Sequence, residues 1–74
     1  MKNDKLVEFI EVSLENCNVI KDALYKNCLL VDFKEGTLYF FDNGHIEVKD
    51  ILLNVDDLES IHKICVAIKN NIFK

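Results

Sequence analysis

Two turns, each containing one of the chain's two glycines, separate three short apolar runs in the middle of the sequence. The runs cover residues 28–33, 37–42 and 45–50. Short runs rich in aromatic and branched residues, bounded by turn residues, are typical of β-strands joined as hairpins. The segment therefore predicts a three-stranded antiparallel meander, against which the rest of a short chain must pack.

The second turn contains Asn43 and Gly44. This dipeptide favours a two-residue type I′ hairpin loop, because both central residues of that loop need a positive φ angle. Such a loop places Phe41 opposite Ile46, and the two side chains then share one face of the sheet.

The first turn ends at Gly36, which suits the left-handed position of a bulge in a three-residue loop. A two-residue loop is the alternative. It shifts the register by one residue and places Asp32 beside Tyr39 on the predicted apolar face. We therefore expect the three-residue loop.

These registers sort the side chains of the meander onto two faces. The face expected to pack in the core carries seven apolar residues: Leu29, Val31, Phe33, Tyr39, Phe41, Ile46 and Val48. The apolar side chains expected on the opposite face, within a rim of charged and polar residues, are Leu30, Leu38 and Phe40.

The segments on either side of the meander have helical spacing. Residues 4–26 predict a helix, with a break allowed in its second half, and a strand over residues 7–14 is the rival interpretation. Residues 16–26 remain open between helix, loop and strand. Residues 55–73 predict the last helix.

The start of this last helix is well marked, because Asn54 suits the N-cap and Asp57 stands at the third helical position. His62, Val66 and Phe73 lie beside its core-facing stripe, which makes the apolar arc wider than one contact needs. The predicted fold class is α+β, in the order helix, three strands, helix (α-β-β-β-α), as a single domain over residues 1–74.

Composition restricts the setting of the protein. The 74 residues carry a net charge of −4. No apolar run is long enough to span a bilayer and no secretion signal is visible, so we expect a cytoplasmic protein without membrane contact. The three cysteines, Cys17, Cys28 and Cys65, include no C-x-x-C pair. We therefore expect neither a disulfide framework nor a metal site.

Catalysis has one weak candidate, the pair Asp42 and His45 on either side of the second turn. A general acid–base pair needs a pocket that shifts its pKa values and excludes water, which a turn at the end of a sheet does not offer. The glycines are isolated, so the chain has no glycine-rich phosphate loop. We expect no enzymatic activity, no catalytic residue and no cofactor.

The order α-β-β-β-α resembles that of the double-stranded RNA-binding domain, in topology alone. That resemblance implies a lysine-rich start to the last helix, where it would contact phosphates. Here residues 54–60 read NVDDLES, whose carboxylates would repel phosphates, and the chain has no arginine. We expect no direct binding of nucleic acid.

The expected function is that of a small non-enzymatic protein-interaction module, which binds a protein partner or a second copy of itself as a homodimer. An exposed apolar patch usually marks an interface, and aromatic anchors within a polar rim are typical of one. The predicted interface combines the open sheet face with a flank of the last helix, through Leu30, Leu38, Phe40, Val66 and Phe73.

An alternative function is that of an acidic inhibitor from a mobile element, similar in size and charge to anti-CRISPR proteins. Such a protein mimics nucleic acid and blocks a nucleic-acid-handling protein. The carboxylates concerned are Asp42, Glu47, Asp50, Asp56, Asp57 and Glu59. Helix-start and turn chemistry explain several of these residues without a functional role. The discriminating feature is whether the carboxylates share one continuous surface.

Overall fold

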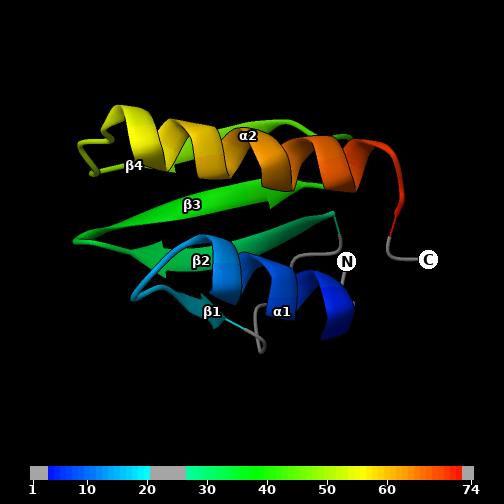
Figure 1. Ribbon diagram of the computed structural model, residues 1–74. Helices are drawn as coiled ribbons and strands as arrows, with labels where there is room; N and C mark the ends of the chain where they lie inside the picture. The colour runs from blue at the N-terminus through cyan, green and yellow to red at the C-terminus, as the bar shows by residue number, and fades with distance from the viewer. Residues whose placement is uncertain (1–3, 21–26, 73–74) are drawn as a thin grey trace.

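Two helices lie side by side on one face of a four-stranded antiparallel sheet in the computed structural model, which describes residues 4–20 and 27–72 (Figure 1). The elements follow each other as α1 (Asp4–Ser13), β1 (Asn18–Ile20), β2 (Cys28–Phe33), β3 (Gly36–Phe41), β4 (Ile46–Lys49) and α2 (Val55–Lys69). The sheet has the order β1-β2-β3-β4, so each strand pairs only with its neighbours in the sequence. The predicted α+β class and antiparallel meander are confirmed.

The first helix is shorter than predicted, and an extra strand follows it. α1 ends at Ser13, and Asn16 then adopts a left-handed conformation with a φ of 58°, which reverses the chain. Val19 pairs with Val31, so β1 joins the edge of the sheet beside β2. The helix predicted over residues 4–26 is thus wrong after residue 13. Of the alternatives for residues 16–26, the strand is confirmed at β1. Residues 21–26 lie outside the described residues.

The core lies between the helices and one face of the sheet. α1 contributes Leu6, Val7 and Ile10, whose spacing of three and four residues places them on one side of the helix. α2 contributes Ile61, Ile64 and Ile68 at the same spacing. The sheet contributes the buried side chains of Val19, Leu29, Val31, Phe33, Leu38 and Phe40.

Both hairpin loops differ in length from the prediction, and each difference shifts the register by one residue. Phe33 pairs with Gly36, so the β2–β3 loop has two residues, and Lys34 rather than Gly36 takes a positive φ of 56°. Phe40 pairs with Ile46, which leaves a longer β3–β4 loop closed by a hydrogen bond of 3.0 Å from the Gly44 N–H to the Phe41 carbonyl.

Together the two shifts turn β3 over while β2 and β4 keep their predicted sides. Leu38 and Phe40 are fully buried at 0% exposure, so the prediction that they face outward is wrong. Tyr39 and Phe41 lie on the opposite face and are half-buried, so their predicted place in the core is also wrong. Ile46 packs against the core as predicted.

The two glycines are needed for different reasons. A Cβ at Gly36 would collide with the Lys49 carbonyl oxygen and with Ile51, because the chain after β4 passes directly over this position. Gly44 has a φ of 88°, which a side chain disfavours, and a Cβ there would lie 2.9 Å from the Cβ of Lys69. Gly44 therefore places the β3–β4 loop against the last turn of α2.

The last helix begins as predicted and ends earlier. The Asn54 side chain accepts a 2.8 Å hydrogen bond from the Asp57 N–H, and an Asp57 carboxylate oxygen accepts one of 3.1 Å from the Asn54 N–H. This reciprocal pair is the capping box that sets the first turn of α2. α2 ends at Lys69, and residues 70–72 form turns, so the predicted extension to residue 73 is too long where the chain is described.

Candidate protein-binding surfaces

The sheet face turned away from the helices carries a row of side chains that crosses all four strands. Ile20 on β1 pairs with Leu30 on β2, Leu30 pairs with Tyr39 on β3, and Tyr39 pairs with Glu47 on β4. Phe41 lies two residues along β3 on the same face, because side chains alternate along a strand. We call Ile20, Leu30, Tyr39 and Phe41 the open-face patch.

The open-face patch is half-buried but lies under neither helix. Both α1 and α2 pack on the opposite side of the sheet, through the core residues described above (Figure 1). All four patch residues have intermediate exposure. Two of them are aromatic, and aromatic side chains are enriched where proteins bind one another.

Charged and polar residues border the patch at one end. A shallow depression of about 460 Å³ is lined there by residues of the β2–β3 hairpin and the end of β4, including Asp32, Glu35, Tyr39, Lys49 and Asp50. With Lys34, which also lines the depression, the charged side chains there are three carboxylates and two lysines. The rim at this end therefore carries net negative charge beside an aromatic ring.

The predicted interface residues fall in different places. Leu30 lies on the open-face patch, whereas Leu38 and Phe40 are in the core and form no exposed surface. Val66 is 40% exposed on α2, on the other side of the molecule from the patch. Phe73 lies outside the described residues. Sequence reasoning missed Ile20, Tyr39 and Phe41, and the hydroxyl of Tyr39 was the signal for an outward position.

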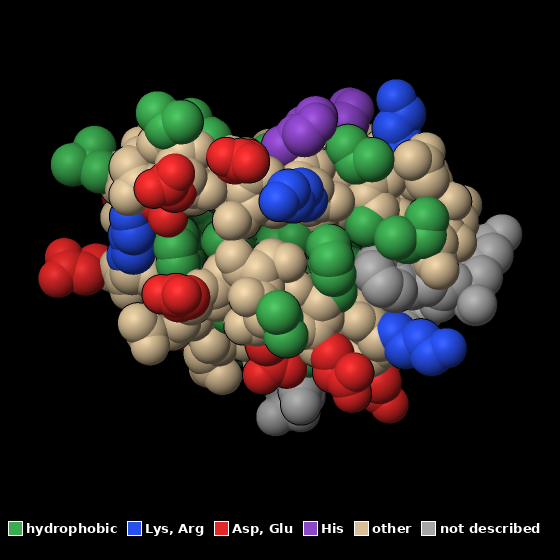
Figure 2. Space-filling view, in the orientation of Figure 1, with side chains coloured by type: hydrophobic (Ala, Val, Ile, Leu, Met, Phe, Trp, Pro, Cys, Tyr) green, Lys and Arg blue, Asp and Glu red, His purple; other side chains and the backbone are tan. Residues whose placement is uncertain are grey.

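A second apolar surface lies on the solvent-facing side of α2. Val55 is 78% exposed and Leu58 is 53% exposed, and with Val66 they recur near the three-to-four-residue spacing that aligns side chains along a helix. His62, also exposed, stands between Leu58 and Val66. Figure 2 shows hydrophobic side chains toward both ends of α2 with histidine between them.

A groove lies between the outer sides of the two helices, next to Val66. It has a volume of about 330 Å³ and is lined mainly by apolar atoms, with Phe9 on α1 and Ala67 and Ile72 at the end of α2. Ile72 is 61% exposed. The groove can accept an apolar side chain from outside.

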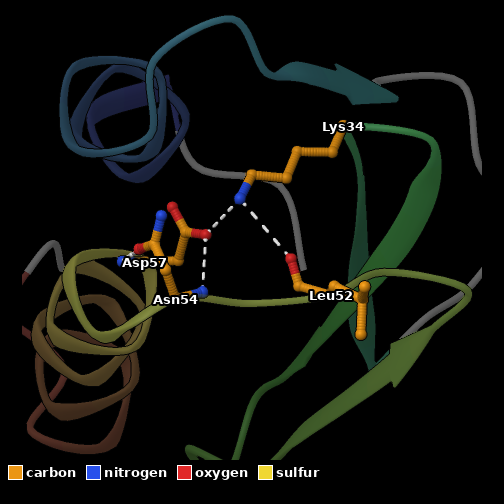
Figure 3. Close-up of polar contacts among 4 residues, drawn as sticks. All are labelled: Lys34, Leu52, Asn54 and Asp57. Atoms are coloured by element: carbon orange, nitrogen blue, oxygen red, sulfur yellow. Dashed lines mark hydrogen bonds and ion pairs between the residues drawn. The ribbon is translucent and has the colours of Figure 1, made fainter.

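Lys34 fastens the start of α2 to the β2–β3 hairpin (Figure 3). Its ammonium pairs with an Asp57 carboxylate oxygen and donates a 3.5 Å hydrogen bond to the Leu52 carbonyl. The hydrogen bond from Lys34, together with that from the Asn54 N–H, lowers the pKa of the Asp57 carboxyl below its usual value of 3.8. Asp57 is thus held in the ionised form by the residues that shape the helix start.

The six carboxylates of the predicted acidic stripe occupy different parts of the surface. Asp42 lies in the β3–β4 loop beside the end of α2, whereas Asp56 and Asp57 lie at the opposite end of that helix. Glu47 lies on the open sheet face. Figure 2 likewise shows acidic side chains in separate groups on the visible face. This distribution gives the inhibitor alternative no support.

The residues that could take part in catalysis or metal binding do not form a closed site in the described part of the chain. Asp42 and His45 are both exposed at the β3–β4 loop, so no closed cleft surrounds them. Burial raises the pKa of the Cys17 and Cys65 thiols, whereas a nucleophilic cysteine needs a lowered one. Within residues 4–20 and 27–72, no three histidine, cysteine, aspartate or glutamate side chains lie close enough together to hold a metal ion.

Comparisons of the chain with protein-family models, with curated proteins and with solved structures give no match. In the described part of the chain, neither helix has the length and apolar character required to cross a membrane.

Proposed function

We propose that this protein is a non-enzymatic interaction module that binds a protein partner through the open-face patch. The observation that supports this proposal is the register of β3, which turns Tyr39 and Phe41 toward the face that neither helix covers. Two aromatic rings beside Leu30, across neighbouring strands, form a compact apolar centre. An apolar centre within a polar rim is the usual construction of a binding surface.

The rim indicates the chemistry of the partner. Asp32, Glu35 and Asp50 lie at one end of the patch, and Glu47 pairs directly with Tyr39. Lys34 and Lys49 are the basic residues that line the depression. A partner with basic side chains around an apolar surface would be complementary to this face, and its association would weaken as salt screens the charges.

A substitution at Phe41 tests the proposal. Phe41→Asp places a charge in the apolar centre while the buried side chains of β3 stay in place. We expect partner binding to weaken by at least about tenfold, because aromatic anchors carry much of the energy of an interface. The partner is first identified by affinity capture and mass spectrometry, then purified, and its direct binding is measured by calorimetry.

Val12→Asp is the matched control, because Val12 is 82% exposed on α1, away from the sheet. It should leave binding unchanged, and circular dichroism should show both variants folded. Equal binding by the folded Phe41→Asp variant and the wild type would exclude the open-face patch as the site.

A further inference from the structure

Four exposed side chains recur every three or four residues along the solvent-facing side of α2. We call this line the α2 seam, and it consists of Val55, Leu58, His62 and Val66. The opposite side of α2 already fills the core, so folding of this subunit does not require a second apolar line. Residues spaced in this way are typical of a helix that packs against another helix.

We infer that the α2 seam is the docking site for a second copy of this chain, with the two α2 helices antiparallel about a two-fold axis near His62. The inference goes beyond the proposed function, because it uses a different surface and a different occupant. It holds whether or not the open-face patch binds a partner.

The seam is self-complementary about this axis. Leu58 lies four residues before His62, and Val66 lies four residues after it, which is about 6 Å in each direction along the helix axis. A two-fold rotation at His62 therefore places Leu58 of each copy against Val66 of the other, at the edge of the groove lined by Phe9 and Ile72. Reciprocal contacts of this kind define a closed two-fold interface.

The charges of α2 select the antiparallel orientation. Asp56 and Glu59 lie in the first half of the helix, and Lys63 and Lys69 lie in the second half. An antiparallel pair brings each acidic half beside a basic half and also opposes the two helix dipoles. A parallel pair would place like charges together, which is unfavourable.

The expected dimer is reversible. α2 has 15 residues and is about 22 Å long, so one helix pair buries less than the roughly 1,200 Å² of the smallest standard interfaces. Because the seam lies on the helix layer, the dimer directs its two open sheet faces outward on opposite sides. A dimer of this form would present two copies of the open-face patch.

Sedimentation equilibrium of the full chain tests the seam. We expect a monomer–dimer equilibrium at concentrations between about 10 μM and 1 mM. Leu58→Gln or Val66→Gln should weaken dimerisation by about tenfold, since each removes a central apolar contact. Val12→Gln, at an exposed valine on α1, should leave it unchanged. A wild-type chain that stays monomeric over the whole range would overturn the inference.

A charge exchange tests the pairing of the two halves. Glu59→Lys and Lys63→Glu should each weaken self-association, because the axis at His62 brings Glu59 of one copy beside Lys63 of the other, and each variant makes this pair like-charged. A mixture of the two variants should associate again as a heterodimer, because both pairs are then opposite in sign. No recovery in the mixture would contradict the seam as the interface.

Cysteine cross-linking tests the orientation. His62→Cys should form a symmetric disulfide between two copies under mild oxidation, since the axis brings residue 62 next to itself. Val55→Cys is the matched control and should not cross-link to itself. Self-cross-linking of Val55→Cys as well as His62→Cys would show a parallel pair, and no cross-linking of His62→Cys would exclude an axis at that residue; either result would overturn the inference. The Phe41→Asp variant should still dimerise, which separates this result from the test of the proposed function.

Discussion

Lys34 makes an ion pair, a backbone hydrogen bond and a cation–π contact. It is one of two residues in the β2–β3 loop, and its ammonium lies 5.4 Å from the centre of the Phe33 ring while contacting Asp57 and the Leu52 carbonyl. The side chain is 40% exposed, so the ion pair alone contributes little to stability. Its value lies in position, since it connects the hairpin to the capping box that begins α2.

The lowered pKa of Asp57 predicts a loss of stability in acid. A carboxyl whose pKa is lower in the folded state stabilises the fold above its unfolded value of 3.8, and this contribution disappears as the pH falls through the folded pKa. We therefore expect the urea midpoint of the wild type to exceed that of Asp57→Asn at about pH 7, with the difference closing as the pH falls below 3.8 and through the lowered pKa of Asp57.

Asparagine is a suitable replacement because its side-chain oxygen still accepts the hydrogen bond from the Asn54 N–H. The variant therefore isolates the charge from the capping geometry. A difference between the two proteins that stays constant from neutral to acid pH would show that the charge of Asp57 does not contribute.

At the scale of elements, strand β3 faces the opposite way from the prediction, which shows what the sequence pattern can and cannot determine. The existence of β2, β3 and β4 and the start of α2 follow from alternation, turn residues and capping residues. The side of β3 that turns toward the core does not follow from the pattern. Leu38 and Phe40 lie on one side of the strand and Tyr39 and Phe41 on the other, and both pairs are apolar. The register then depends on the turns, where the predicted loop lengths are wrong: Gly36 does not take the positive φ expected of it, whereas Gly44 does, with a φ of 88°, in a longer loop than predicted.

A two-residue loop does bring Asp32 onto the same face as Tyr39, as expected from the sequence. That face is the exposed one, however, so the carboxylate of Asp32 stays in water. The polar hydroxyl of Tyr39 fits this half-buried position, whereas the side chains of Leu38 and Phe40 have no polar atoms to satisfy in the core.

The strand β1 could not be predicted from the sequence pattern. It has three residues, too few for an alternating pattern to be told from helical spacing. Its conformation is fixed by pairing with β2, which is a tertiary contact. For the same reason, the open-face residue Ile20 had no local signal.

Neighbouring phenylalanines on β3 give a direct test of its orientation. Phe40→Ala should destabilise the fold by about 3–5 kcal/mol, because it removes a fully buried ring and leaves a cavity. Phe41→Ala should cost much less, since Phe41 is half-buried on the open face. Denaturant unfolding of both variants measures the difference, and the reverse order of stabilities would contradict the observed register.

At the scale of the whole molecule, apolar residues exceed what one core uses. Half of the 74 residues are hydrophobic, and they appear on two surfaces outside the core, the open-face patch and the α2 seam. A domain of this size buries only about 60% of the surface of its unfolded chain and is marginally stable alone. Association on these surfaces would therefore add to the stability of the subunit.

This coupling predicts that thermal stability depends on protein concentration. If the α2 seam holds a dimer, the Tm should rise by several degrees between about 10 μM and 1 mM, because each kcal/mol of association shifts Tm by about 4–8 °C in a domain of this size. Differential scanning calorimetry measures the shift. Leu58→Gln should have a Tm that does not change with concentration, and an equal rise in that variant would point to association elsewhere.

The side-by-side packing of α1 and α2 has a consequence for biosynthesis. The two helices are the first and last elements of the described chain. The core side chains of α2 that pack with Ile10 of α1 are therefore synthesised roughly 50 residues after it. A chain that lacks α2 would leave the core-facing side of the sheet half covered. Packing of α2 therefore completes the burial of the core. A chain truncated before α2 would expose apolar side chains and would be prone to aggregate.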